Sequence, residues 1–185
     1  MQYRTLGRTG LEVSLVSYGS GGPSKLGQNT GLSSTEQDNL VQHCLDLGIN
    51  LIDTSEGYGG SEAILGRALN GVPRDSYILA TKCIYKNNDG TLRTPEDIRR
   101  SIDASLQRLN TDCVDIMQFH VLNSADYFDV VEHHYPVLKR AQEQGKIRFI
   151  GFSEQFMKEG DHKGVVLALN SHPELWDTIM LKYGI

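Results

Sequence analysis

The stretch that decides the fold of this chain runs from residue 77 to residue 120, where two strand patterns flank a helix pattern. It reads YILATK at residues 77–82, TPEDIRRSIDASLQRL at residues 94–109 and VDIMQFH at residues 114–120. The outer segments are short and apolar, whereas the middle one repeats apolar residues at helical spacing. Strands separated by a helix run parallel, because antiparallel neighbours are usually joined by short hairpins. The segment therefore predicts a β-α-β unit.

The same alternation of strand and helix patterns continues on both sides of this unit, roughly every 30 to 35 residues. Ser33 and Glu36 form a capping box that predicts a helix start, and Pro95 marks the first turn of the next helix. A third helix is predicted near residues 127–144, ending at Gly145. Strands are predicted at residues 13–18, 50–53, 77–82, 114–120, 147–152 and 178–182.

This period places the chain in the α/β class and leaves two architectures, an open doubly wound sheet and a (β/α)₈ barrel. The open dinucleotide-binding fold normally carries G-x-G-x-x-G after its first strand, but GSGGPS at residues 19–24 lacks the third glycine. We therefore predict a TIM-type (β/α)₈ barrel. About six of the eight βα units are present, which suggests truncation at the C-terminus. Residues 1–185 are expected to form one domain, with an N-terminal hairpin at residues 3–14.

Composition restricts the partners that we expect for this chain. Eighteen Lys plus Arg against 23 Asp plus Glu give a net charge of −5, so the basic character typical of a nucleic-acid-binding protein is absent. The longest apolar stretch, residues 165–169, is far shorter than the roughly 20 residues of a membrane span. Cys44, Cys83 and Cys113 are odd in number and widely spaced, which favours reduced thiols. We expect a cytoplasmic protein that binds neither nucleic acid nor membrane.

Four polar side chains follow or end successive predicted strands: Asp53, Tyr58, Lys82 and His120. The carboxyl ends of barrel strands share one rim, where catalytic residues from several strands meet. A tyrosine hydroxyl, with an ordinary pKa of about 10, becomes a useful proton donor when a nearby cation stabilises its phenolate. Lys82 is the candidate cation, Asp53 would hold the ammonium in place, and His120 would orient a carbonyl. These groups suit reduction of a carbonyl by a hydride-donating cofactor.

Each of these residues also has an ordinary structural explanation. An aspartate after a strand often caps a turn, and a tyrosine between glycines can pack a loop. A lysine at a strand end can be an ordinary surface amine, and a lone histidine is often a satisfied core residue. Another hypothesis gives Lys82 the role of a nucleophile that forms a Schiff base with a carbonyl compound. It leaves Tyr58 and Asp53 without a function. The adjacent His133 and His134 point in different directions on a helix, so no metal site is predicted.

The motifs around these residues resemble those of the aldo-keto reductase family. In that family's signature, Asp-Thr-Ala is followed by Tyr-Gly and then by Ser-Glu, and residues 53–62 read DTSEGYGGSE. LGRTGLEVS at residues 6–14 is similar to the family's N-terminal hairpin. ATK at residues 80–82 and DIMQFH at residues 115–120 resemble its lysine and histidine strands. GKIRFIGFS at residues 145–153 resembles its fifth strand, so the resemblance spans essentially the whole chain.

The resemblance implies an NADPH-dependent oxidoreductase that reduces aldehydes or ketones, or oxidises alcohols. Carried over by position, Tyr58 is the general acid, Lys82 stabilises its phenolate, Asp53 holds Lys82, and His120 orients the carbonyl. The expected cofactor is NADP(H), with NAD(H) as the alternative, and the substrate is a small carbonyl compound or alcohol. The cofactor would lie along Ser20, Gly21, Asp53, Ser153 and Glu154.

A second hypothesis is a catalytically inactive barrel fragment, or a cofactor-binding or regulatory subunit that needs a partner or its missing strands. Glu154 stands where the family commonly has Asn, and Met180 where it usually has Gln. Ser153 has a second explanation as the cap of the following helix. An open sheet leaves two unpaired edges, which favours self-association.

Overall fold

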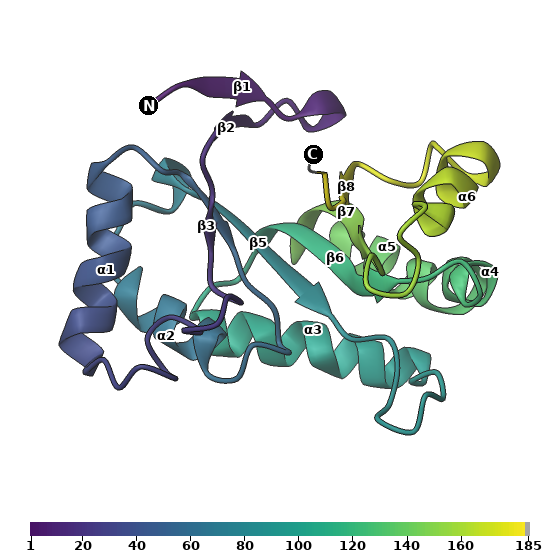
Figure 1. Ribbon diagram of the computed structural model, residues 1–185, viewed down its shortest axis with the longest axis horizontal. Helices are drawn as coiled ribbons and strands as arrows, with labels where there is room; N and C mark the ends of the chain where they lie inside the picture. The colour runs from purple at the N-terminus through teal and green to yellow at the C-terminus, as the bar shows by residue number, and fades with distance from the viewer. Residues whose placement is uncertain (184–185) are drawn as a thin grey trace.

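The fold is built on a parallel sheet that curves into half a barrel. The structure, a computed structural model, describes residues 1–183. Within that range, six strands follow one another in space in the order in which they occur along the chain (Figure 1). This order is typical of a (β/α)₈ barrel, so the predicted fold class is confirmed for the part present. The strands are β3 (Tyr18–Gly19), β4 (Leu51–Asp53), β5 (Ile78–Cys83), β6 (Val114–Leu122), β7 (Ile147–Glu154) and β8 (Thr178–Met180).

Helices cover the outer side of the curved sheet, from α1 on the left of Figure 1 through α3 below to α6 on the right. The predicted capping box forms: Ser33 exchanges hydrogen bonds with Glu36 at the start of α1. A second capping box, not predicted from the sequence, links Thr94 and Asp97 at the start of α3, where Pro95 occupies the first turn. The helices are α1 (Ser34–Asp46), α2 (Ser61–Ala68), α3 (Pro95–Leu109), α4 (Tyr127–Asp129), α5 (Tyr135–Glu143) and α6 (Lys163–Ser171), with 3₁₀ turns η1 (Gly7–Thr9) and η2 (Arg74–Ser76).

The helix predicted at residues 127–144 is continuous but irregular. Its middle part, η3 (Val130–His134), is a π-helix between α4 and α5. Tyr135 donates its N–H to the carbonyl of Val130, five residues earlier, and the next residue, Pro136, has no N–H to donate. The widened turn lies where the proline interrupts the regular ladder, a detail that the 3.6-residue apolar period does not reveal.

An antiparallel hairpin precedes the sheet, as predicted for residues 3–14. It pairs β1 (Tyr3–Thr5) with β2 (Glu12–Ser14). The strand predicted at residues 13–18 is wrong in its extent, because the first part of it belongs to the hairpin and the sheet strand is only β3. The Ser14 hydroxyl donates to the carbonyl of Val16 over 2.7 Å, which favours a bend between the two strands.

The apolar residues form two cores on opposite faces of the sheet. The larger one lies between the sheet and the helices, and the smaller one lies on the concave face. In the smaller core, Leu11 and Val13 of the hairpin pack against Ile78, Ala80 and Ile116 near the starts of β5 and β6. The hairpin therefore closes the amino-terminal end of the half-barrel, while the carboxyl ends of the strands remain accessible.

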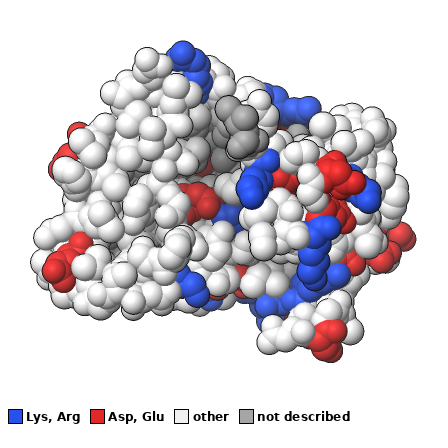
Figure 2. Space-filling view, in the orientation of Figure 1, with Lys and Arg blue, Asp and Glu red and all other residues white. Residues whose placement is uncertain are grey.

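Charged side chains of both signs are interspersed on the face drawn in Figure 2, and some of them lie in its central hollow. Within residues 1–183, no helix is long and apolar enough to cross a bilayer.

The three cysteines, Cys44, Cys83 and Cys113, are free thiols.

A substitution at the contact between α2 and α3 tests this packing. A Cβ atom on Gly66 would lie 2.3 Å from the carbonyl oxygen of Arg108 and 2.8 Å from the carbonyl carbon of Leu109. Backbone atoms cannot move aside as a flexible side chain can, so Gly66→Ala should lower the free energy of unfolding by about 1–3 kcal/mol. Urea unfolding measures the change. Gly160→Ala, where the new Cβ meets nothing within 4 Å, is the control and should have a much smaller effect.

Candidate active site

The predicted catalytic residues meet at the carboxyl ends of three adjacent strands. Asp53 ends β4, Lys82 lies near the end of β5, and His120 lies near the end of β6. Tyr58 belongs to the loop that follows β4. We call these four residues the tetrad. A cavity of about 210 Å³ at this rim is lined by Tyr58, Lys82 and His120, together with Ser153 and other residues of the later strands.

A buried ion pair lies at the base of the tetrad. The Lys82 side chain is 1% exposed, and its Nζ donates to Oδ2 of Asp53 over 2.5 Å and to the carbonyl oxygen of Thr54 over 2.9 Å. Burial raises the pKa of the Asp53 carboxyl, and the neighbouring Lys82 charge counteracts part of this effect. The second oxygen of Asp53, Oδ1, is buried without a hydrogen-bond partner among the described residues.

Tyr58 lies above this pair. Nζ of Lys82 is 5.0 Å from the centre of the Tyr58 ring, and the His120 ring meets the Tyr58 ring edge to face with 5.4 Å between centroids. A Cβ on Gly21 would lie 2.3 Å from the tyrosine ring, so only glycine permits the chain after β3 to approach so closely. The structure therefore brings Gly21 against the general acid predicted from the sequence.

His120 is held in its neutral form. Burial, followed by the nearby Lys82 charge, lowers the pKa of His120 from 6.5 to about 4. The residue that follows, Val121, has φ +54°, which a β-branched side chain rarely adopts. Its N–H donates to the Ser153 hydroxyl over 2.9 Å. Backbone strain of this kind costs about 1–3 kcal/mol and is often found at functional sites.

Three residues that sequence reasoning overlooked hold the loop of Tyr58. Gln28 donates to the Tyr58 carbonyl and accepts from the N–H of Gly60. Glu56 accepts from the N–H of Ile84 over 2.5 Å, and it also forms a 3.0 Å ion pair with an arginine that precedes α3. Ser55 is fully buried and contacts the tetrad directly. Glu56 and Ser55 lie inside the motif at residues 53–62, which was the only sequence signal for them.

Ser20 and Ser153, both predicted to contact a cofactor, lie at the ends of β3 and β7. Ser20 is 1% exposed, and its hydroxyl has no hydrogen-bond partner among the described residues. The alternative that Ser153 caps the next helix is wrong, because α6 begins only at Lys163 and the Ser153 hydroxyl accepts from Val121 instead. The Ser153 hydroxyl proton remains available to a ligand.

Glu154 is buried and already has two partners. One oxygen accepts from Nδ1 of His162 over 2.6 Å, and the other accepts from the backbone N–H of Lys182. The side chain thus connects the loop after β7 to the segment after β8. A carboxylate has about four lone-pair sites, so these two bonds leave it able to accept from a further donor.

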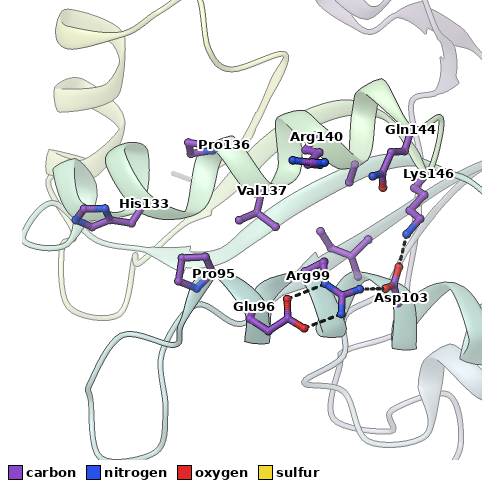
Figure 3. A pocket seen from close by; sticks show the side chains of 12 residues that line it. Pro95, Glu96, Arg99, Asp103, His133, Pro136, Val137, Arg140, Gln144 and Lys146 are labelled. Carbon is purple, nitrogen blue, oxygen red and sulfur yellow. Dashed lines mark hydrogen bonds and ion pairs between the residues drawn. The ribbon is translucent and has the colours of Figure 1, made fainter.

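A larger groove of about 670 Å³ lies between α3 and α5 on the outer side of the molecule (Figure 3). Most of its charged side chains pair with one another: Arg99 pairs with Glu96 and Asp103, and Lys146 also pairs with Asp103. The groove is remote from the carboxyl ends of the strands, where barrel active sites are formed. We therefore place the candidate site at the smaller cavity. Within residues 1–183, no group of three or more potential metal ligands is found.

Comparison with known proteins shows the family of this chain. The sequence profile of the Aldo/keto reductase family matches residues 19–162, so the chain belongs to this family. The chain is 40% identical over 158 residues to an L-galactose dehydrogenase of Arabidopsis thaliana, covering 83% of the chain and 48% of the relative. It is 33% identical over 204 residues to an NADH-specific methylglyoxal reductase of Escherichia coli (strain K12), covering 97% of the chain and 58% of the relative.

Solved structures give the same result. An aldo-keto reductase of Bacillus halodurans, in its holo form, superposes with a TM-score of 0.73 at 28% identity, covering 99% of this chain and 58% of that one. The chain thus spans about half to three fifths of the length of these relatives.

The buried ion pair yields a stability prediction. Asp53→Asn leaves the Lys82 ammonium buried without a counter-charge, which should lower the free energy of unfolding by about 3–5 kcal/mol in urea titrations. The double variant Asp53→Asn/Lys82→Met removes both charges and should recover a large part of this loss. An equally unstable double variant would show that the uncompensated charge is not the cause.

His120 yields a pH prediction. The unfolded chain takes up a proton on this imidazole near pH 6.5, whereas the folded chain does so only near pH 4. Below pH 6.5 the unfolded state binds more protons, so the free energy of unfolding should fall as the pH falls from 6.5 to 4. His120→Gln should remove part of this slope in urea titrations at several pH values. Parallel slopes in the two proteins would contradict the lowered pKa.

Proposed function

We propose that this protein is an NAD(P)H-dependent oxidoreductase that interconverts small aldehydes or ketones and alcohols. The observation that supports this most strongly is the buried Lys82–Asp53 pair beneath the Tyr58 ring, with His120 at the ring edge. A buried ion pair between a lysine and an aspartate would by itself suit many roles. Its position under a phenol that borders a cavity suits proton transfer to a carbonyl oxygen.

In this proposal each residue of the tetrad has a separate task. Tyr58 donates its hydroxyl proton to the carbonyl oxygen as that oxygen gains charge, and the buried ammonium of Lys82 stabilises the phenolate that remains. Asp53 holds the ammonium in place. His120, neutral at physiological pH, adds a hydrogen bond to the carbonyl oxygen without competing as an acid. In oxidation of an alcohol the phenolate takes the proton back.

The residues present fit the nicotinamide end of a cofactor, which would supply the hydride when bound. The Ser153 hydroxyl can donate to a carboxamide oxygen, and Glu154 can accept from the carboxamide nitrogen. Ser20 and Asp53 each have a buried oxygen that lacks a partner among the described residues, and Gly21 keeps the chain close to Tyr58. We propose NADP(H) as the cofactor, with NAD(H) as the alternative.

A second candidate function is a binding or regulatory subunit without activity of its own. One observation favours it: the described sheet ends in two edge strands, β3 and β8, and Met180 and Leu181 beside the cavity are about two-fifths exposed. Edges and apolar side chains of this kind favour association with another segment or with a second copy of the chain.

Replacement of the general acid tests the proposed activity. Tyr58→Phe removes the proton donor and keeps the ring, so carbonyl reduction with NADPH or NADH should fall by at least about 10²-fold. The dissociation constant of the cofactor, followed by its fluorescence, should change little. Steady-state kinetics with a panel of small aldehydes measures the first quantity. Unchanged turnover in the variant would overturn the proposed role of Tyr58, and a folded wild-type protein without turnover would favour the second function.

A further inference from the structure

Ser55, which the catalytic proposal leaves without a role, forms a hydrogen bond with the His120 ring. Its side chain is fully buried, and its Oγ lies 3.0 Å from Nδ1 of His120. Two further groups lie near this hydroxyl: the N–H of Gly57, which donates to it over 3.1 Å, and the carbonyl oxygen of Lys82 at 3.4 Å. The serine therefore connects the Tyr58 loop, β5 and the imidazole.

The distances indicate the direction of the hydrogen bond between Ser55 and His120. A hydroxyl has one proton to donate, and the lone pair that faces Gly57 is already used. If the proton went to the Lys82 carbonyl, it would span 3.4 Å, beyond the usual 2.5–3.0 Å of an O–H···O bond. Donation to Nδ1 of His120 gives the shorter contact, and that nitrogen then accepts.

The consequence concerns the opposite ring nitrogen. A neutral imidazole carries one proton, so a ring that accepts at Nδ1 holds its proton on Nε2. Among the described residues Nε2 has no hydrogen-bond partner, and His120 lines the cavity beside Tyr58. A carbonyl oxygen there has two lone pairs, which a phenol O–H and an imidazole N–H together satisfy.

We propose that Ser55 is a positioning residue that fixes His120 in the Nε2–H tautomer and so presents a second hydrogen-bond donor to the substrate carbonyl. The inference rests on the proposed reductase function for its consequence in catalysis. Its structural content, the tautomer, is independent of turnover. With alanine in place of Ser55, Nδ1 loses its donor, and only the weaker intrinsic preference of a neutral imidazole for the Nε2–H tautomer remains.

The experiment is a long-range ¹H–¹⁵N spectrum of the imidazole groups in ¹⁵N-labelled protein near pH 7, without substrate. The signal of His120 is identified by its loss in His120→Gln. We expect the wild-type protein to show Nδ1 unprotonated and Nε2 protonated. Ser55→Ala should show a mixture with a measurably larger fraction of the Nδ1–H tautomer than the wild-type protein, and Ser55→Thr, which keeps the hydroxyl, should restore the wild-type pattern.

Ser105→Ala is the matched control. Ser105 is also a buried serine, and its hydroxyl bonds to Glu62 and Arg108, away from His120. It should lose stability as Ser55→Ala does and keep the wild-type tautomer. In kinetics, Ser55→Ala should lower kcat by at least about tenfold with little change in the dissociation constant of NADPH, whereas Ser105→Ala should leave both unchanged.

A wild-type spectrum with the proton on Nδ1, or a Ser55→Ala spectrum identical to it, would overturn the assignment of Ser55. These outcomes are distinct from a failure of the proposed function. A wild-type protein that shows the expected tautomer but reduces no carbonyl with either cofactor would overturn the reductase activity alone, since the spectrum is recorded without substrate.

Discussion

The ammonium of Lys82 is the constraint on which the rest of the site depends. A charged group that is 1% exposed persists only if nearby groups replace its hydration, and here Asp53 and the Thr54 carbonyl do so. Such a pair is a poor source of stability, because an apolar pair of similar volume is often as stable. We infer that the pair serves chemistry: it supplies positive charge beneath a phenol, and the same charge adds to the effect of burial in lowering the pKa of His120.

The role proposed for the buried charge also requires that the loop of Tyr58 be held in place. A phenol next to an ammonium is useful only if its ring stays over the charge, and loops are ordinarily the most mobile part of a barrel. Here Gln28 fixes the loop on one side and Glu56 on the other, while Gly21 leaves room for the ring. Backbone and side-chain bonds from three separate segments thus compensate for the loop's lack of regular structure.

Much of this arrangement follows from the sequence, because the parallel order places successive strand ends at one rim. The period of the strand and helix patterns predicts the sheet, the capping box at Ser33 predicts the start of α1, and Pro95 predicts the start of α3. The spacing of the motifs brings the tetrad together. The short β3 is different: the bend after Ser14 depends on a hydrogen bond that no apolar pattern encodes. The partners of Ser153 and Ser55 likewise lie on other strands, so their contacts appear only when residues distant in the chain are placed side by side.

The parts of the site differ in how completely the described chain supports them. The tetrad belongs to β4, β5, β6 and the loop after β4, strands that are paired on both sides within the sheet. Ser153 and Glu154 lie at the end of β7, whose outer neighbour β8 is three residues long and forms the edge. An edge strand has unpaired backbone groups and fewer packing contacts than an internal one, so it opens at lower free energy. The groups proposed for proton transfer therefore lie in the internal part of the described sheet, and the residues proposed for nicotinamide binding lie beside its less stable edge.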